Sequence, residues 1–205
     1  SLTVSTIETV TGSTSTATND VLRLLGEGNT AVSVVETVLG SAATESVTML
    51  SGTALGVSGV DTVIGTSGAE NVTLLGGDSM AVSAVATVTG SSGTDTVTML
   101  DAATLAVRNV ESIVGLTTTD DVVRMLGGGT IAVSNIASVM GTTGAAAILR
   151  IIGGTETVTV TDIETVLGAS GTDSVALAAA GSIAVSAVDT VIGSTGGNDR
   201  VVLIG

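Results

Sequence analysis

Hydrophobic residues alternate with threonine and serine along most of this chain, in short runs that end in glycine or serine. A two-residue period is typical of β-strands, and no segment keeps the 3.6-residue period of a helix. One phrase recurs throughout: a valine or isoleucine, most often an acid, a threonine or serine, a second aliphatic residue, and a glycine two positions later. The spacing between successive copies is 25 to 28 residues, and the copies end at Gly12, Gly40, Gly65, Gly90, Gly115, Gly141, Gly168 and Gly193.

Each repeat contains three strand-like pieces. The first ends in Ala-Val-Ser, as at residues 31–33. The second reads Val-Glu-Thr-Val, as at residues 35–38. The third reads Asp-x-Val-x-Leu/Met-Leu, as at residues 95–100. A repeat of about 25 residues with three strands suits one coil of a solenoid, whose strands pair in parallel with the next coil at about 4.8 Å. The sequence therefore predicts an all-β parallel β-solenoid (β-helix): eight coils of about 25 residues, three short strands per coil, in one uncapped domain over residues 1–205. A β-sandwich is the alternative, but sandwiches rarely keep a fixed period.

Three aliphatic rows follow from this period, and we expect them to face inward. The chain has no Phe, Tyr or Trp, so the core must be thin enough for facing aliphatic side chains to fill. The rows are Ile7, Val35, Val60, Val85, Val110, Ile136, Ile163 and Val188; Val10, Val38, Val63, Val88, Ile113, Val139, Val166 and Val191; and Leu22, Val47, Val72, Val97, Val123, Leu149, Val175 and Val201.

Composition excludes several function classes. The net charge of −14, from 19 acids and 5 arginines, opposes nucleic-acid binding, which requires a basic face. Because His, Cys, Lys and Tyr are absent, the usual catalytic bases and nucleophiles are missing, and we expect no enzyme. No apolar run reaches the roughly 18 residues of a membrane helix. Acidic, cysteine-free, repetitive chains suit the outside of a bacterial cell, so we expect an extracellular or cell-surface location.

The period also places the acids in two rows. They are Glu8, Glu36, Asp61, Glu111, Glu164 and Asp189, and Asp20, Glu45, Glu70, Asp95, Asp121, Asp173 and Asp199. Stacking would put like charges one coil apart, where salt screens them in part. Two interpretations stay open: solvated stripes that keep the protein soluble, or cation sites, since Ca²⁺ is bound by carboxylate and carbonyl oxygens.

The segments Gly90–Thr98 and Gly168–Ala176 resemble the nonapeptide G-G-x-G-x-D-x-U-x of RTX, haemolysin-type proteins, and Gly65–Thr73 is similar with Glu70 in place of Asp. The resemblance implies a degenerate RTX-like protein of secreted bacterial origin, with calcium held at the turns. It makes Asp95 and Asp173 the best candidate ligands, followed by Glu70 and Asp199. The second Gly of the motif is Ser, Thr or Ala in every copy, so we expect no cofactor other than weakly bound Ca²⁺.

Two further patterns concern partners. Apolar rows lie beside the inner rows and should face outward in part, which suggests lateral association; they are Leu25, Leu50, Leu75, Leu100, Leu126 and Ile152, and Leu39, Ile64, Val114, Met140, Leu167 and Ile192. Joining the last residues, 203–205, to the first, 1–5, closely copies the internal segment 125–134, which suggests head-to-tail stacking. The sequence therefore predicts a structural, self-assembling extracellular protein that forms a filament, surface layer or stalk; the alternative is a calcium-binding RTX-like segment of a large bacterial adhesin.

Overall fold

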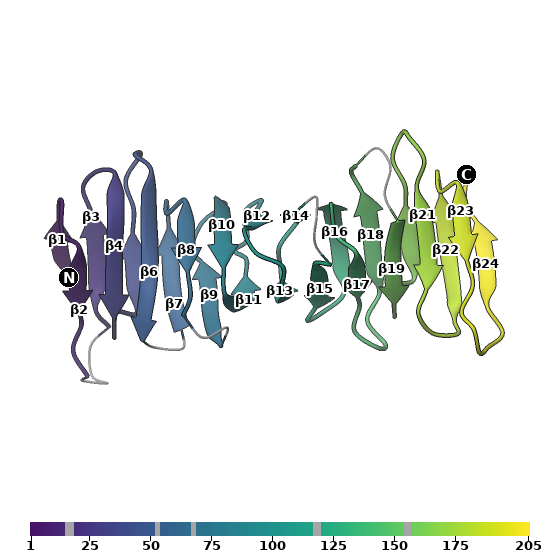
Figure 1. The fold of residues 1–205 in the computed structure, drawn as a ribbon, viewed down its shortest axis with the longest axis horizontal. Coiled ribbons are helices and arrows are strands. Elements are labelled where there is room, and N and C mark those ends of the chain that lie inside the picture. Colours follow the sequence, from purple (N-terminus) through teal and green to yellow (C-terminus); the bar gives the residue numbers. More distant parts are fainter. Residues whose placement is uncertain (15–18, 52–53, 67–68, 117–119, 154–156) are drawn as a thin grey trace. The chain divides into compact units, whose positions relative to one another are not determined.

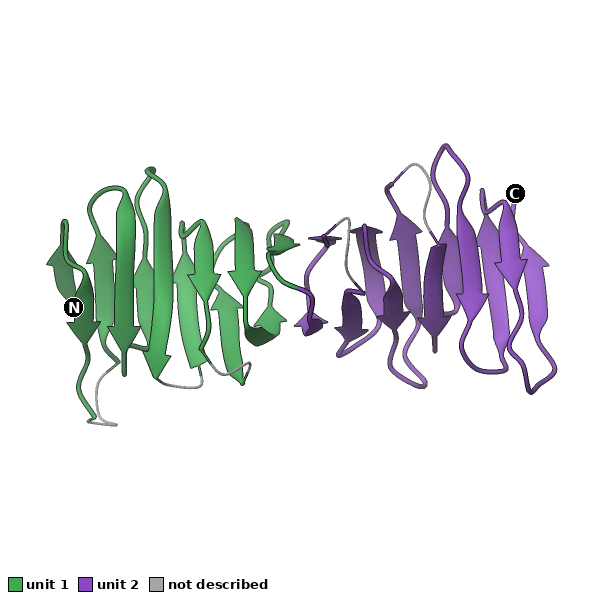
Figure 2. Ribbon diagram, viewed as in Figure 1, with its two compact units in different colours: residues 1–101 green, residues 102–205 purple. Residues whose placement is uncertain are grey.

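The computed structural model of the 205-residue chain describes residues 1–14, 19–51, 54–66, 69–116, 120–153 and 157–205. These residues form strands joined by corners and turns, and the described part contains no helix. The chain divides into two compact units, unit 1 over Ser1–Asp101 and unit 2 over Ala102–Gly205 (Figure 2). Each unit is a stack of coils in which every strand pairing between coils is parallel, which confirms the predicted parallel β-solenoid.

Unit 1 winds alternately through two sheets (Figure 1). One sheet contains β1 (Leu2–Val4), β3 (Val21–Leu24), β5 (Thr37–Leu39), β7 (Ala54–Ser58), β9 (Glu70–Leu74) and β11 (Val85–Thr89). The other contains β2 (Thr9–Thr11), β4 (Gly28–Ser33), β6 (Glu45–Ser51), β8 (Thr62–Ile64), β10 (Ser79–Ser83) and β12 (Thr96–Met99).

Unit 2 repeats this arrangement. Its odd-numbered strands are β13 (Thr104–Arg108), β15 (Val122–Met125), β17 (Ser138–Met140), β19 (Thr157–Thr161), β21 (Ser174–Leu177) and β23 (Thr190–Ile192). Its even-numbered strands are β14 (Ser112–Val114), β16 (Gly129–Ser134), β18 (Ala147–Ile151), β20 (Thr165–Leu167), β22 (Ser182–Ser186) and β24 (Arg200–Leu203).

The predicted coil, eight of about 25 residues with three strands each, is wrong. A coil contains two strands and about 17 residues. The chain changes sheet after every strand, and the 25-residue repeat contains three strands, so one repeat makes one and a half coils. Consecutive repeats therefore place the same position on opposite sheets: Val38 lies in β5 and Val63 in β8. Val63 pairs with Val47 of the coil before it and with Val82 of the coil after it.

The three aliphatic rows face inward as predicted, although each row alternates between the two sheets. Their members are buried except in the terminal coils, where Ile7 and Val201 are exposed. Leucine and methionine side chains, among them Met49, Met80 and Met99, fill the remaining volume between the sheets. Two sheets facing each other at about 10 Å leave a core that aliphatic side chains fill without aromatic rings.

Tight corners explain the recurring glycine. The residue after each Ala-Val-Ser-type run has a positive φ, for example Val34 (φ 55°) and Ala187 (φ 52°). Its carbonyl group packs against the recurring glycine one coil earlier. A Cβ atom on Gly168 would lie 1.9 Å from the carbonyl oxygen of Ala187, and a Cβ atom on Gly12 would lie 1.9 Å from that of Val34. Only glycine therefore fits at these positions.

The first of the two outer apolar rows faces outward, as expected. Leu25, Leu50, Leu75, Leu100 and Ile152 are each about half exposed. The row does not form one continuous stripe, because its members alternate between the two edges of the solenoid. Neighbours on the same edge are three coils apart, roughly 14 Å at 4.8 Å per coil. No helix in the described residues is long and apolar enough to cross a membrane.

Candidate functional site

The acids of the second row lie in the loops that join the sheets. We call the side where the chain passes from an odd-numbered to an even-numbered strand the first edge, and the opposite side the second edge. The first edge carries Glu45, Asp95 and Asp199, and the second edge carries Asp20, Glu70, Asp121 and Asp173. Within unit 1, Glu45 and Asp95 on the first edge, and Asp20 and Glu70 on the second, are three coils apart; within unit 2, Asp121 and Asp173 are also three coils apart. The expected one-coil stacking of this row is therefore wrong.

These carboxylates are not a solvated stripe. Asp95, Asp121 and Asp173 are fully buried, and Glu45 and Glu70 are 1% and 2% exposed. Asp20 and Asp199 are half-buried. Burying an ionised carboxylate costs free energy unless hydrogen bonds or opposite charges compensate it, so the partners of each carboxylate decide what the row does.

Each carboxylate of this row folds back onto its own loop. It accepts a hydrogen bond from the backbone N–H of the residue that follows the recurring glycine, at 2.5 to 2.9 Å. The donors for Asp20, Glu45, Glu70, Asp95, Asp121, Asp173 and Asp199 are Ser13, Ser41, Thr66, Ser91, Leu116, Ala169 and Ser194, in that order. Where the donor is Ser41, Thr66, Ser91 or Ser194, its hydroxyl group also donates to the same carboxylate.

The recurring glycine leaves room for this contact. A Cβ atom on Gly115 would lie 2.6 Å from Asp121 Oδ2, and a Cβ atom on Gly168 would lie 2.9 Å from Asp173 Oδ2. The glycine and the acid five or more residues later thus form one unit, a closed loop held by a charge-assisted hydrogen bond.

The predicted metal ligands differ in whether the second carboxylate oxygen also accepts a hydrogen bond. Asp95 Oδ1 accepts the N–H of Asp78 at 3.0 Å, and Asp199 Oδ1 accepts the N–H of Gly181 at 3.2 Å, in each case from the preceding coil. Glu70 Oε2 accepts the N–H of Ala69 at 2.9 Å. Both oxygens of these three side chains are therefore engaged by the protein.

Three buried oxygens lack a hydrogen-bond partner in the described structure: Asp173 Oδ1, Glu45 Oε2 and Asp121 Oδ1. Of these residues, only Asp173 is a ligand that the sequence predicts. Glu45 and Asp121 lie outside the nonapeptide-like segments, and no sequence signal distinguishes them from the other acids of the row.

The first acidic row connects neighbouring coils. The carboxylates of Glu36, Asp61, Glu164 and Asp189 each accept the backbone N–H of the second-row position one coil earlier, at 2.7 to 2.9 Å. The donors are Asp20, Glu45, Ala147 and Asp173. The repeat period alone gives two separate rows, whereas the fold brings their members together in pairs at the same edge.

The described residues contain no group of three or more His, Cys, Asp or Glu side chains that could hold a metal ion. A metal bound by these acids would therefore need backbone carbonyl oxygens and water as ligands in addition to one or two carboxylates. Whether Asp95, Asp173, Glu70 or Asp199 binds calcium stays a prediction.

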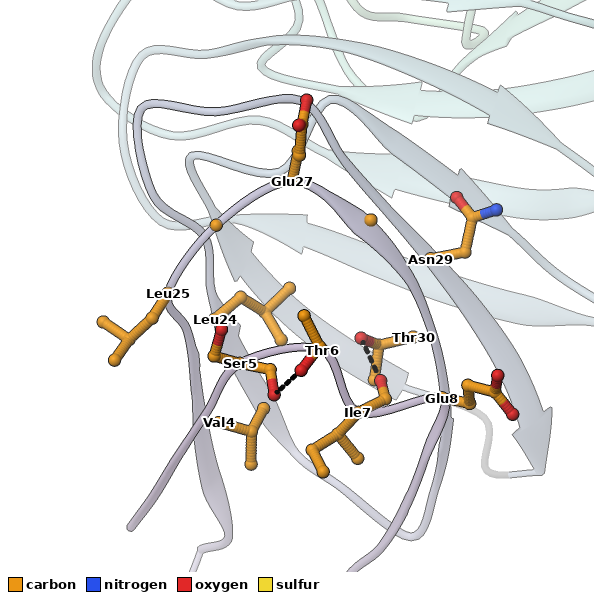
Figure 3. Close-up of a pocket in the computed structure, with 12 residues that line it drawn as sticks. Val4, Ser5, Thr6, Ile7, Glu8, Leu24, Leu25, Glu27, Asn29 and Thr30 are labelled. Atoms are coloured by element: carbon orange, nitrogen blue, oxygen red, sulfur yellow. Dashed lines mark hydrogen bonds between the residues drawn. The ribbon is translucent and has the colours of Figure 1, made fainter.

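A surface groove of about 370 Å³ lies on the first edge of unit 1 (Figure 3). It is lined by the corner around Thr6 and by the glycine-rich corner around Glu27 in the next coil. Two of its hydroxyl groups donate to backbone carbonyls, Thr6 to Ser5 at 2.7 Å and Thr30 to Ile7 at 3.0 Å, so their protons are used within the protein. The lining residues hold no nucleophile paired with a base.

Comparison with protein-family models, with curated proteins and with solved structures found no match. The RTX-like interpretation consequently rests on the nonapeptide-like segments alone, and the fold of stacked parallel coils is the part of it that the structure supports.

Proposed function

We propose that this chain is a structural, self-assembling protein of the cell exterior and not an enzyme, and that its coils build a filament, surface layer or stalk. The observation that carries the proposal is the use of the acids. The carboxylates of the second row are buried or half-buried and close the loops of their coils, so they are not presented to a substrate. Hydrogen bonds to charged groups contribute about 1.5 to 3 kcal/mol each, so this arrangement favours rigidity.

Self-assembly is supported by the way the coils stack. Every strand pairing between coils is parallel, so each strand presents its backbone N–H and C=O groups to the strand of the next coil. A second chain of the same fold would offer the same groups, and strand edges of this kind are templates for another chain.

Light scattering coupled to size-exclusion chromatography, followed by negative-stain electron microscopy, tests the proposal on the 205-residue chain. We expect linear particles whose length grows with protein concentration. Leu203→Asp should shorten or abolish them, because it places a charge on the end strand β24. Leu75→Asp, the same change at an exposed position on the outer surface of unit 1, is the control and should leave them intact. A monodisperse monomer of 19.6 kDa at every concentration would contradict head-to-tail assembly.

A calcium-binding segment of an RTX-like adhesin is the second candidate, and Asp173 is the observation that favours it. This residue lies in a nonapeptide-like segment, is fully buried, and its Oδ1 atom has no hydrogen-bond partner in the described structure. If this function holds, calcium should raise the thermal unfolding midpoint of the chain, and Asp173→Asn should remove that increase. Equal midpoints in calcium and in EDTA would exclude it.

A further inference from the structure

The buried carboxylate of Glu45 is unevenly hydrogen-bonded. Glu45 opens β6 on the first edge of unit 1 and is 1% exposed. Its Oε1 atom accepts the backbone N–H of Ser41 at 2.7 Å and also the Ser41 hydroxyl. Its Oε2 atom is buried and has no hydrogen-bond partner in the part of the chain that the structure describes.

The preceding coil explains why Oε2 is left without a donor. At Asp95, the residue one coil earlier is Asp78, whose N–H donates to the second carboxylate oxygen. At Glu45, the corresponding residue is Gly28, where β4 begins. The N–H of Gly28 donates to the carbonyl oxygen of Thr44 at 3.1 Å instead. Backbone pairing between β4 and β6 thus uses the donor that would otherwise satisfy the side chain.

Acidic residues occupy the corners before and after Glu45 on the same edge. Successive coils on the first edge of unit 1 place Glu27, Glu45, Asp61 and Asp78 in consecutive corners, and Asp61 Oδ2 accepts the backbone N–H of Glu45 at 2.9 Å. Residues 1–101 contain ten acids and one arginine, a net charge of 1 − 10 = −9, and the arginine, Arg23, lies within a strand, β3, and not in a corner of this edge. Unit 1 therefore offers no basic side chain in these corners to offset the charge.

We infer that Glu45 and Asp61 hold a hard divalent cation of the calcium class, with Glu45 Oε2 as the inner ligand. A buried carboxylate oxygen without a donor is costly while it is ionised, and a bound cation would offset that cost where the chain supplies no donor. Calcium is bound by six to eight oxygens from carboxylates, backbone carbonyls and water. With two carboxylates, the affinity should fall in the weak range, a Kd of about 10⁻⁴ to 10⁻³ M. The inference does not rest on the proposed assembly, and Glu45 lies outside the nonapeptide-like segments.

Thermal unfolding followed by circular dichroism tests the site, because the chain has no Tyr or Trp to report by fluorescence. At 10 mM Ca²⁺ we expect the midpoint of the parent chain to rise by roughly 3 to 10 °C over the midpoint in EDTA at equal ionic strength. Glu45→Gln should lose most of this increase, and Asp61→Asn should lose part of it. Asp95→Asn is the matched control: it is equally buried and both its oxygens accept hydrogen bonds, so the variant should keep the increase.

Equilibrium dialysis of the parent chain against Ca²⁺, with Mg²⁺ as a competitor, measures binding directly. The inference is overturned if no calcium is bound at 10 mM, or if Glu45→Gln and Asp61→Asn keep the full increase. It is also overturned if Asp95→Asn or Asp173→Asn removes the increase while Glu45→Gln does not, a result that would place the cation in the nonapeptide-like segments. Should Glu45→Gln fail to fold, Asp61→Asn decides alone, since that side chain is exposed.

Discussion

Replacing Gly168 by alanine tests the contact that defines the repeat. The added Cβ atom would lie 1.9 Å from the carbonyl oxygen of Ala187 and 2.9 Å from Asp173 Oδ2. The first overlap cannot be relieved by a side-chain rotation, because the obstructing atom belongs to the backbone of the next coil. That backbone is held in place, since the N–H of Gly168 donates to the carbonyl oxygen of Ser186 at 2.9 Å. Overpacking costs about 1 to 3 kcal/mol, and displacing the Asp173 carboxylate from Ala169 N–H costs about another 1.5 to 3 kcal/mol.

The expected loss for Gly168→Ala is therefore about 2.5 to 6 kcal/mol, measured as the change in free energy of unfolding in guanidinium chloride, followed by circular dichroism. Gly196→Ala is the matched control in the same unit, because a Cβ atom there meets nothing within 4 Å. It should change the free energy of unfolding by less than about 0.5 kcal/mol. Equal unfolding midpoints for the two variants would refute the claim that backbone stacking demands glycine at the recurring position.

Three other predictions address the core, the acids and the repeat. Val97→Asp, in β12, should cost at least about 4 kcal/mol because it puts an unpaired charge into the core, and a chain that still unfolds cooperatively near the parent midpoint would disprove the register. Asp189→Ala should lower the free energy of unfolding by about 1 kcal/mol through the lost bond from Asp173 N–H, as measured in urea; an unchanged midpoint would mean that this bond contributes nothing. Deleting residues 41–65, one repeat, should leave a folded solenoid by circular dichroism, whereas deleting residues 45–61, one coil, should not. The second deletion places β8, a Val-Glu-Thr-Val-type strand, directly after β4, an Ala-Val-Ser-type strand, in the sheet, and the described sheets contain no pair in that order. Similar spectra for both variants would contradict this.

The residues that face inward could be predicted from the sequence, but the number of strands and residues per coil could not. Val63 and Val97 are buried as the period predicts, because a two-residue alternation fixes which side chains of a strand share a face. The number of strands per coil depends on how sharply the chain turns between them. That turn uses positive φ values at residues such as Val34 and Ala84, which are not glycine and carry no local signal for this conformation. The sequence therefore shows a period of three strands but not that this period spans one and a half coils.

The positions of the acids along the repeat could be predicted from the sequence, but their burial and hydrogen-bond partners could not. A serine or threonine directly after a recurring glycine, followed by an acid, as in Gly65-Thr66 and Glu70, is the sequence signal for this closed loop. The free oxygen of Glu45 could not be predicted, because it results from the backbone pairing of Gly28, a residue one coil away.

Because each repeat makes one and a half coils, an odd number of repeats moves the chain to the opposite edge, and an even number returns it to the same edge. Inside one unit, Leu25 and Leu50 hold the same repeat position on opposite edges, whereas Leu25 and Leu75, two repeats apart, share an edge. Duplication of a single repeat would accordingly reverse the side on which everything after it is displayed, while duplication of a pair would preserve it. A family of such chains that grew by single repeats would alternate between presenting two features on one side and presenting them back to back, without any change in the residues that form either feature.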